Sequence, residues 1–423
     1  MKVKKENIVL ILIVVLFAMI YILSELNPNV LFAANIIICI FICIKAKFSL
    51  FSIKSFLINY VLIAVAFQYN TGKSYGLLSM GIYPLRYDMM CGLALIYNCI
   101  MLVYLINSNI LKREEEILKY KVQENIIFST ICSVLAIGFS IIAFPSLNFK
   151  FGSYARFDAL LPGNAWNHMA IISLIFAMPN FKKSKIVKFS YLFCIAWFLL
   201  HSERVDMVGL ILALIIILIV NGKETAKKLL SFKNMKYYII GLIAFVVLVY
   251  IGEYRSGRTE FNFETITRKM LVQNTAADVG YVYNSAILYK EANGLMYGKT
   301  YLLYIIKIIP LISSAKYDAV AILQKTYNTA GGILNLAEPY MNFGVLGIVL
   351  FAIVELSIIN FILKKKKDYN FFLYIFILAT PFRVTWYGLM YIEKGIIYIM
   401  PVLYILYMII NRNNNIKELE WKK

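Results

Sequence analysis

Charge is scarce in this chain of 423 residues. Charged side chains make up 16% of the sequence, hydrophobic residues make up 61%, and the mean hydropathy is +0.73. A soluble domain is usually nearer to about 45–50% apolar. Apolar runs recur from end to end, and many approach the roughly 20 residues that a bilayer core requires. We therefore expect an all-α polytopic integral membrane protein.

The sequence also lacks the motifs of nucleotide-driven and metal-dependent enzymes. It has no P-loop, GxSxG or HExxH pattern, no DxD pair in a predicted outer loop and no glycine-rich nucleotide site on the inner side. The six cysteines all fall inside apolar runs, and no histidine or acid accompanies the closely spaced Cys39 and Cys43, as expected for small hydrophobic side chains. We expect no metal, no disulfide and no cofactor.

Twelve apolar segments are candidate membrane spans. The first follows a charged start and has no small-residue cleavage site, so we expect a retained helix rather than a removed signal peptide. We divide the chain into residues 1–251 with nine spans, the large loop 252–338, and residues 339–423 with three spans and a basic tail. The candidate spans are 8–23, 30–44, 49–67, 89–106, 126–144, 164–179, 188–200, 206–220, 237–251, 339–363, 370–385 and 395–411.

The net charge is +20, and the basic residues lie mostly in the short gaps between apolar runs. They do not form a separate basic domain of the kind that binds nucleic acid. Gaps on one side of the predicted membrane, with Lys54 and Lys188, carry 27 Lys and Arg residues, against seven on the other side once the long loop is set aside. Since cytoplasmic loops are enriched in these residues, we expect both termini in the cytoplasm and the long loop outside.

Arginine and lysine are distributed differently. Of nine arginines, only Arg113 and Arg412 fall on the inner side, whereas 25 of 34 lysines do. The planar guanidinium group of arginine binds diphosphate and carboxylate groups through two hydrogen bonds. The concentration of arginine on the predicted outer side therefore indicates an anion-binding site there. The alternative is that these arginines are interfacial anchors or form internal salt bridges. The outer arginines are Arg86, Arg156, Arg204, Arg255, Arg258, Arg268 and Arg383.

Two outer segments outside the long loop contain candidate polar groups. Loop 145–163 carries Arg156 and leads into His168, in a cluster that could equally be an aromatic belt. The hinge between the seventh and eighth spans places His201, Glu203, Arg204 and Asp206 between apolar helices. Polar side chains at that depth are costly unless they are paired with one another or serve a function.

The long loop, Gly252–Glu338, is predicted to contain helices over 264–274 and 276–292. The second helix carries Asp278 and a tyrosine cluster including Tyr281 and Tyr283, which could stack on sugars or simply mark the headgroup zone. Tyr301–Ser314 is too short to span, which indicates an interfacial or re-entrant helix. Glu338 opens the tenth span as a carboxylate near the membrane surface.

The outer arginines, carboxylates and histidines together are suited to binding a lipid diphosphate substrate. Arginine would neutralise a diphosphate leaving group, and a carboxylate or histidine would take the proton from an attacking hydroxyl. The candidate bases are Glu338, His201, Asp278 and His168, and the sequence does not choose among them.

Four ordered stretches, spread over roughly residues 145–355, resemble the Wzy-type polysaccharide polymerases, which are related to the O-antigen ligases. They are ARFDALLPGNAWNHMAIISL, HSERVDMVGLILAL, KEANGLMYGKTYL and EPYMNFGVLGIVLF. In the second stretch Glu203 separates the serine and arginine that are adjacent in the family. The resemblance implies a fold like the GT-C integral-membrane glycosyltransferases. It also implies metal-independent polymerisation of undecaprenyl-diphosphate-linked oligosaccharide repeat units into a surface polysaccharide, such as O-antigen or capsule, in the bacterial cytoplasmic membrane.

The resemblance carries over best to Arg156 and Arg204, and to Arg255, Arg258 and Arg268 only as basic residues of the loop. It implies Arg204, with Arg255 or Arg258, on the diphosphate, and Arg156 on a second diphosphate or the glycan. Expected partners are the lipid-linked oligosaccharide and membrane lipid. A chain-length regulator and a flippase are further partners to consider. Ligase-like transfer to another acceptor, a lipid-linked oligosaccharide flippase or transporter, and a scaffold remain alternatives.

Overall fold

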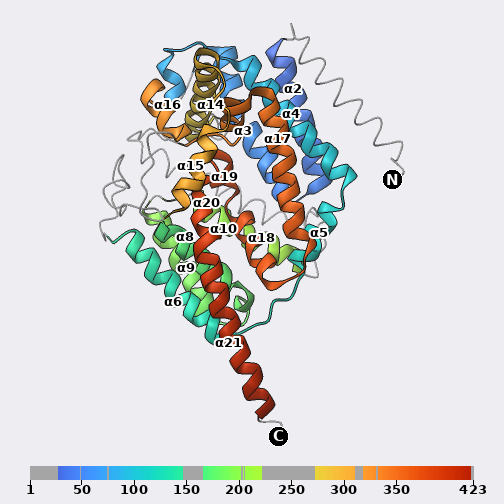
Figure 1. The fold of residues 1–423 in the computed structure, drawn as a ribbon, viewed down its shortest axis with the longest axis vertical. Helices are drawn as coiled ribbons and strands as arrows, with labels where there is room; N and C mark the ends of the chain where they lie inside the picture. The colour runs from blue at the N-terminus through green and yellow to red at the C-terminus, as the bar shows by residue number, and fades with distance from the viewer. Residues whose placement is uncertain are drawn as a thin grey trace, which may run out of the picture. The chain divides into compact units, whose positions relative to one another are not determined.

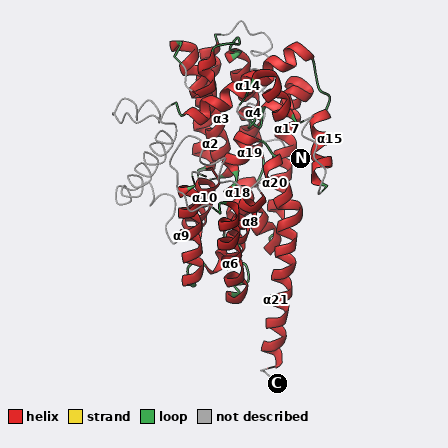
Figure 2. Ribbon diagram, turned by 90° about the vertical axis from the view of Figure 1, so that its left-hand side faces the viewer, coloured by secondary structure: helices red, strands yellow, loops and turns green. Residues whose placement is uncertain are grey.

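The computed structural model describes residues 27–47, 49–73, 76–145, 165–201, 203, 205–221, 272–309, 318–329 and 332–420. Every regular element in these ranges is helical, as Figures 1 and 2 show, which confirms the all-α prediction. Within the described ranges, six helical stretches are long and apolar enough to cross a membrane, as in a multi-pass membrane protein: α2 (Pro28–Ala46), α3 (Leu50–Thr71), α4 (Tyr87–Asn107), α6 (Ile126–Ala143), α17 (Ala337–Lys364) and Ile392–Arg412.

The other predicted spans fall on shorter helices or outside the described residues. The last stretch joins α20 (Met390–Lys394), a π-helical turn η5 (Gly395–Ile399) and α21 (Met400–Glu420). The predicted span 370–385 is broken, because α18 (Asp368–Ala379) ends before Pro381, which begins α19 (Pro381–Tyr387). Three predicted spans correspond to α8 (Ala165–Ala177), α9 (Lys185–Leu200) and α10 (Val205–Asn221). Spans 8–23 and 237–251 lie outside the described ranges.

The remaining helices are short or belong to the long loop. Short helices between spans are η1 (Gly76–Met80), α5 (Ile110–Leu118) and η2 (Met178–Asn180). The long loop contributes α14 (Asn274–Asn293), α15 (Lys299–Ile308) and α16 (Ala319–Tyr327). The prediction of a helix over 276–292 is confirmed by α14, whereas the predicted helix 264–274 falls almost entirely on residues that are not described.

The chain divides into two compact units. The first comprises Met1–Glu114, Asn262–Phe361 and Pro381–Tyr391, and the second comprises Glu115–Phe261, Ile362–Thr380 and Ile392–Lys423. Each unit therefore draws on segments far apart in the sequence, and the first combines early spans with most of the long loop.

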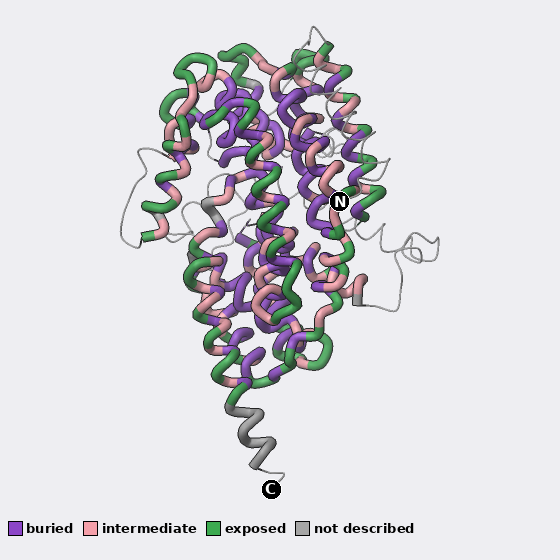
Figure 3. Tube along the Cα trace, turned by 45° about the vertical axis from the view of Figure 1, so that its right-hand side comes forward, coloured by how far each residue is buried: buried purple, intermediate pink, exposed green. Residues whose placement is uncertain are grey.

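In the first unit, α14 is packed as a core helix rather than laid on the surface. Eleven of its residues are buried, and Figure 3 shows buried segments concentrated inside the packed helices. A Cβ added to Gly280 would lie 2.8 Å from Val65 Cγ2, so the absence of a side chain allows α14 to approach α3 closely. The long loop is thus anchored in the helical core.

Polar side chains inside the first unit are matched to one another. Ser55 Oγ donates to Asn98 Oδ1 at 3.0 Å, and Asn98 Nδ2 donates to Asn35 Oδ1 at 3.1 Å. Lys54 forms an ion pair with Glu355, whose other oxygen accepts a 2.5 Å hydrogen bond from Tyr97. Lys54 was counted above with the cytoplasmic lysines, but it is buried. A charge in a bilayer is costly unless it is paired, and this pairing lets α3, α4 and α17 pack together.

The second unit is held by aromatic stacking and a few buried hydrogen bonds. The rings of Phe176 on α8 and Phe372 on α18 stack at 4.1 Å. The Tyr407 hydroxyl on α21 donates to Asp368 Oδ2 at 2.6 Å. Asn125 Nδ2 donates to Asn411 Oδ1 at 2.7 Å, which joins the start of α6 to α21.

Candidate functional site

Helix α17 changes direction sharply at Gly344. This residue has φ 63° and ψ −145°, which breaks the helix into 337–343 and a longer part that begins after it. A Cβ at Gly347 would lie 2.0 Å from the Pro339 carbonyl oxygen, so the chain doubles back on itself where only glycine fits. Because the break interrupts the helical ladder, the carbonyls before it need other donors.

The turn before α15 supplies those donors. The Met296 and Tyr297 N–H groups donate to the carbonyls of Met341 and Asn342 at 3.1 and 3.0 Å. The Asn342 side chain donates to Thr300 Oγ1 at 2.7 Å. Two stretches singled out in the sequence, KEANGLMYGKTYL and EPYMNFGVLGIVLF, are therefore joined directly.

Helix α15 runs antiparallel to the first turns of α17. Its start is bonded to residues 341 and 342, whereas further along it the Tyr304 hydroxyl donates to Glu338 Oε2. Between them, the Tyr301 ring stacks on Phe343 with centroids 6.4 Å apart. Glu338 is 6% exposed, so Tyr304 orients a buried carboxylate.

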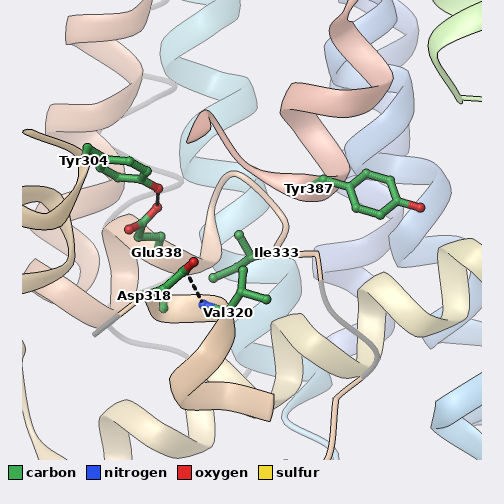
Figure 4. A pocket seen from close by; sticks show the side chains of 7 residues that line it. Tyr304, Asp318, Val320, Ile333, Glu338 and Tyr387 are labelled. Atoms are coloured by element: carbon green, nitrogen blue, oxygen red, sulfur yellow. Dashed lines mark hydrogen bonds between the residues drawn. The ribbon is translucent and has the colours of Figure 1, made fainter. Parts of the chain in front are cut away.

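Glu338 and Tyr304 line a cavity of about 170 Å³. Figure 4 shows their side chains pointing toward one another, with Asp318 beside them and the Tyr387 ring pointing away. Asp318 caps α16, since its Oδ1 accepts from the Val320 N–H at 3.0 Å. The other lining residues are Ala319, Val320 and Ile333, so two carboxylates and a phenol share a partly apolar cavity.

The Tyr304 phenol remains protonated under ordinary conditions. Burial, and after it the negative charge of Glu338, hold the pKa of Tyr304 well above its usual range. The same two causes raise the pKa of Tyr301. A phenol that keeps its proton donates to the carboxylate and stabilises its ionised form, which is the form that accepts a proton. The arrangement can therefore hold a general base.

Asp278, Tyr281 and Tyr283 do not line this cavity. A Cβ at Gly76 would lie 2.2 Å from Asp278 Oδ1, so the Asp278 carboxylate packs against η1. The Tyr281 hydroxyl donates to the Tyr327 carbonyl at 2.9 Å, and the Tyr283 hydroxyl to the Met90 carbonyl at 3.4 Å. Both rings are buried. Sugar stacking on these two tyrosines is not supported, because their faces are covered by helix packing.

The two histidines belong to the second unit. His201 follows α9 and is buried, with its Nδ1 2.8 Å from the Trp197 carbonyl and its ring stacked on Phe144 at 5.0 Å. His168 on α8 is buried near the Phe376 ring. Glu203 and Asp206 are buried as well, so the described residues of the polar hinge lie inside the protein. Glu338 and Asp278 lie in the first unit.

Five predicted anion-binding residues, Arg156, Arg204, Arg255, Arg258 and Arg268, lie outside the described residues. Two other outer arginines have clear partners. Arg86 Nε and Nη2 donate to Glu291 Oε1 at 2.9 and 2.6 Å, so Arg86 forms a salt bridge within the protein. The Arg383 guanidinium lies 5.0 Å from the centre of the Tyr387 ring.

Sequence reasoning missed Tyr304, Asp318 and the Lys54–Glu355–Tyr97 cluster. The spacing between Tyr304 and Glu338 is set by the turn at 294–298, which hydropathy does not reveal. A lysine and a glutamate within separate apolar runs were the available signal for the cluster. No group of three or more His, Cys, Asp or Glu side chains in the described ranges could hold a metal ion.

Comparison of the chain with protein-family models, curated proteins and solved structures gives no match. The class that the fold defines is a multi-pass α-helical membrane protein.

Proposed function

We propose that this protein is a membrane glycosyltransferase that polymerises undecaprenyl-diphosphate-linked oligosaccharide repeat units. The reaction would take place on the outer face of the bacterial cytoplasmic membrane, with both termini in the cytoplasm. The observation that carries the proposal is the buried Glu338 carboxylate, oriented by Tyr304, in a cavity formed by the long loop and the start of a candidate span.

In this proposal Glu338 is the general base. It takes the proton from a hydroxyl of the acceptor sugar, whose oxygen attacks the anomeric carbon of the donor glycan. The bond between that carbon and the diphosphate oxygen breaks, and undecaprenyl diphosphate leaves with the electron pair. Arginines favour this step by neutralising the leaving group, a role proposed for Arg204 with Arg255 or Arg258.

The cavity suits the acceptor better than the diphosphate. Its lining contains two carboxylates, two tyrosines and aliphatic side chains, and none of the seven lining residues is Lys or Arg. Sugar hydroxyls donate well to carboxylates, whereas a diphosphate would be repelled by them. In this proposal the cavity therefore binds the acceptor and not the diphosphate leaving group.

A transporter or flippase is the second candidate, and two observations favour it. The Lys54–Glu355 ion pair lies inside candidate spans, and α17 is interrupted at Gly344. Intramembrane charges and broken helices are frequent in transporters. Ligase-like transfer keeps the proposed chemistry and changes only the acceptor.

Deletion of the gene, followed by analysis of lipid-linked glycans, distinguishes these functions. Accumulation of single repeat units on lipid supports polymerisation. Accumulation of full-length polymer on lipid indicates a ligase, and loss of outward-facing glycan indicates a flippase. Either of the last two outcomes would overturn the polymerase proposal.

A further inference from the structure

The outer side of α15 is an uninterrupted aliphatic stripe. Leu302, Ile305, Ile306 and Ile309 are 61%, 64%, 38% and 50% exposed. Their spacing of three, one and three residues places them on one face of a helix. The opposite face is occupied by the buried Thr300 and Leu303, so α15 has one side in the protein and one side with no covering residues in the described part of the chain.

This stripe continues onto a candidate span. Tyr301 stacks on Phe343, which precedes the long part of α17. From there an exposed aliphatic row follows α17 through Leu346, Leu350 and Ile353. Since α17 is long and apolar enough to cross a membrane, its exposed row is the surface that lipid would contact, and α15 extends that surface sideways.

The direction of α15 relates it to the membrane. In Figures 1 and 2, the axis of α15 lies roughly parallel to that of the long part of α17 that follows Gly344. The hydrogen bonds described above place its first residue at the level of the Gly344 break and Tyr304 at the level of Glu338. A helix that lies alongside a membrane span extends into the bilayer. The ten residues of α15 reach about 15 Å, which is roughly half of the thickness of the hydrocarbon core.

We infer that α15 is a re-entrant helix that enters the outer leaflet and turns its Leu302, Ile305, Ile306 and Ile309 face to lipid acyl chains. A second protein is a poorer fit, because this stripe has none of the tryptophan, tyrosine or arginine anchors that dominate protein interfaces. Tyr304 faces the cavity from the other side of the same helix, so α15 separates Glu338 from lipid.

The inference stands without the glycosyl-transfer proposal, because it concerns only how α15 meets the membrane. It is tested with single cysteines at Leu302, Ile305 and Ile309, each labelled with bimane in proteoliposomes. Leu346→Cys on α17 serves as the lipid-facing control, and Lys325→Cys on the exposed part of α16 as the aqueous control. The labelled parent protein measures the background from its own cysteines, five of which are buried.

Quenching by lipids brominated at different acyl carbons reports depth, and iodide reports contact with water. We expect the labels at 305 and 309 to be quenched by brominated lipid as strongly as at 346, and by iodide several-fold less than at 325. Depth should increase by about 10 Å from 302 to 309, at 1.5 Å per residue. Equal depths would show a helix lying in the interface. Iodide quenching as strong as at 325 would show a helix in water. Protection from both quenchers would show a covering protein, and each of these results overturns the inference.

Discussion

Two glutamates on α17 have opposite surroundings. Glu355 accepts from Lys54 on one oxygen and from Tyr97 on the other, and its side chain is 10% exposed within the helix bundle. Glu338 accepts from Tyr304 and lines a cavity large enough for a ligand group. A carboxylate whose two oxygens are engaged by neighbouring helices is suited to holding them together. A carboxylate beside a cavity is suited to chemistry. Substitution at Glu338 should therefore reduce polymer formation, whereas breaking the ion pair of Glu355 should reduce stability.

The largest effect should come from Glu338→Gln. The amide keeps the shape of the side chain but cannot take a proton at neutral pH, so polymer formation should fall by about 10²–10⁴-fold. The measurement is complementation of a deletion strain, with polymer length resolved on gels and protein level in the membrane monitored. Normal polymer at normal protein level would remove Glu338 from the role of base and return His201, His168 and Asp278 to consideration.

Lys54→Met should act on stability instead. Removing one partner leaves Glu355 buried without its cation, which typically costs about 3–5 kcal/mol in the free energy of unfolding. Thermal unfolding of the purified protein in detergent measures the loss. The double variant Lys54→Met/Glu355→Leu should recover most of it, because neither charge is then left alone.

Lys325→Met, on the exposed part of α16, is the matched control for Lys54→Met and should change stability by less than about 0.5 kcal/mol. If Lys54→Met unfolds at the same temperature as the parent, the ion pair is not a structural clamp. If the double variant is no more stable than the single one, the loss arises from packing and not from an uncompensated charge.

Tyr304→Phe sharpens the comparison at the cavity. It removes one hydrogen bond to a charged group while keeping the ring, and such bonds contribute about 1.5–3 kcal/mol. We expect polymer formation to fall about tenfold, because Glu338 is less well oriented. Tyr301→Phe, one turn earlier on α15, is the control and should behave like the parent. Equal effects of the two changes would show that Tyr304 does not act through Glu338.

The smallest effect should come from Asp318, the second carboxylate of the cavity. Asp318→Ala removes the cap of α16 and should lower stability by about 1 kcal/mol, whereas Asp318→Asn keeps a capping oxygen and should be nearly neutral. Both should retain polymer formation if Asp318 serves the helix alone. Loss of activity in Asp318→Asn, as severe as in Glu338→Gln, would show that Asp318 also takes part in the reaction.

Much of the local structure was accessible from the sequence. Hydropathy located the helices, and the run 276–292 became α14 almost residue for residue. Glu338 was singled out because it opens an apolar run, and the hinge at 201–206 was recognised as polar between apolar helices. These features depend on neighbouring residues, which periodicity and composition register directly.

What the sequence could not provide depends on contacts across the fold. Tyr281 and Tyr283 were predicted either to stack on sugars or to mark the headgroup zone, but α14 is packed in the core and both rings are buried. Tyr304 was overlooked within an apolar run, although the turn at 294–298 directs it to Glu338. Lys54 was counted with the cytoplasmic cations, because its partner Glu355 lies 301 residues away. Each of these positions is decided by which helix faces become neighbours.

The central claim is tested most directly by reconstitution. The purified protein is placed in liposomes that contain lipid-linked single repeat units as the only glycan, and the products are separated by size. The account predicts a ladder of lipid-linked oligomers, with one lipid diphosphate released for each bond formed, and no ladder with Glu338→Gln. Wild-type protein that leaves the repeat units single, while moving them across the bilayer, would contradict it.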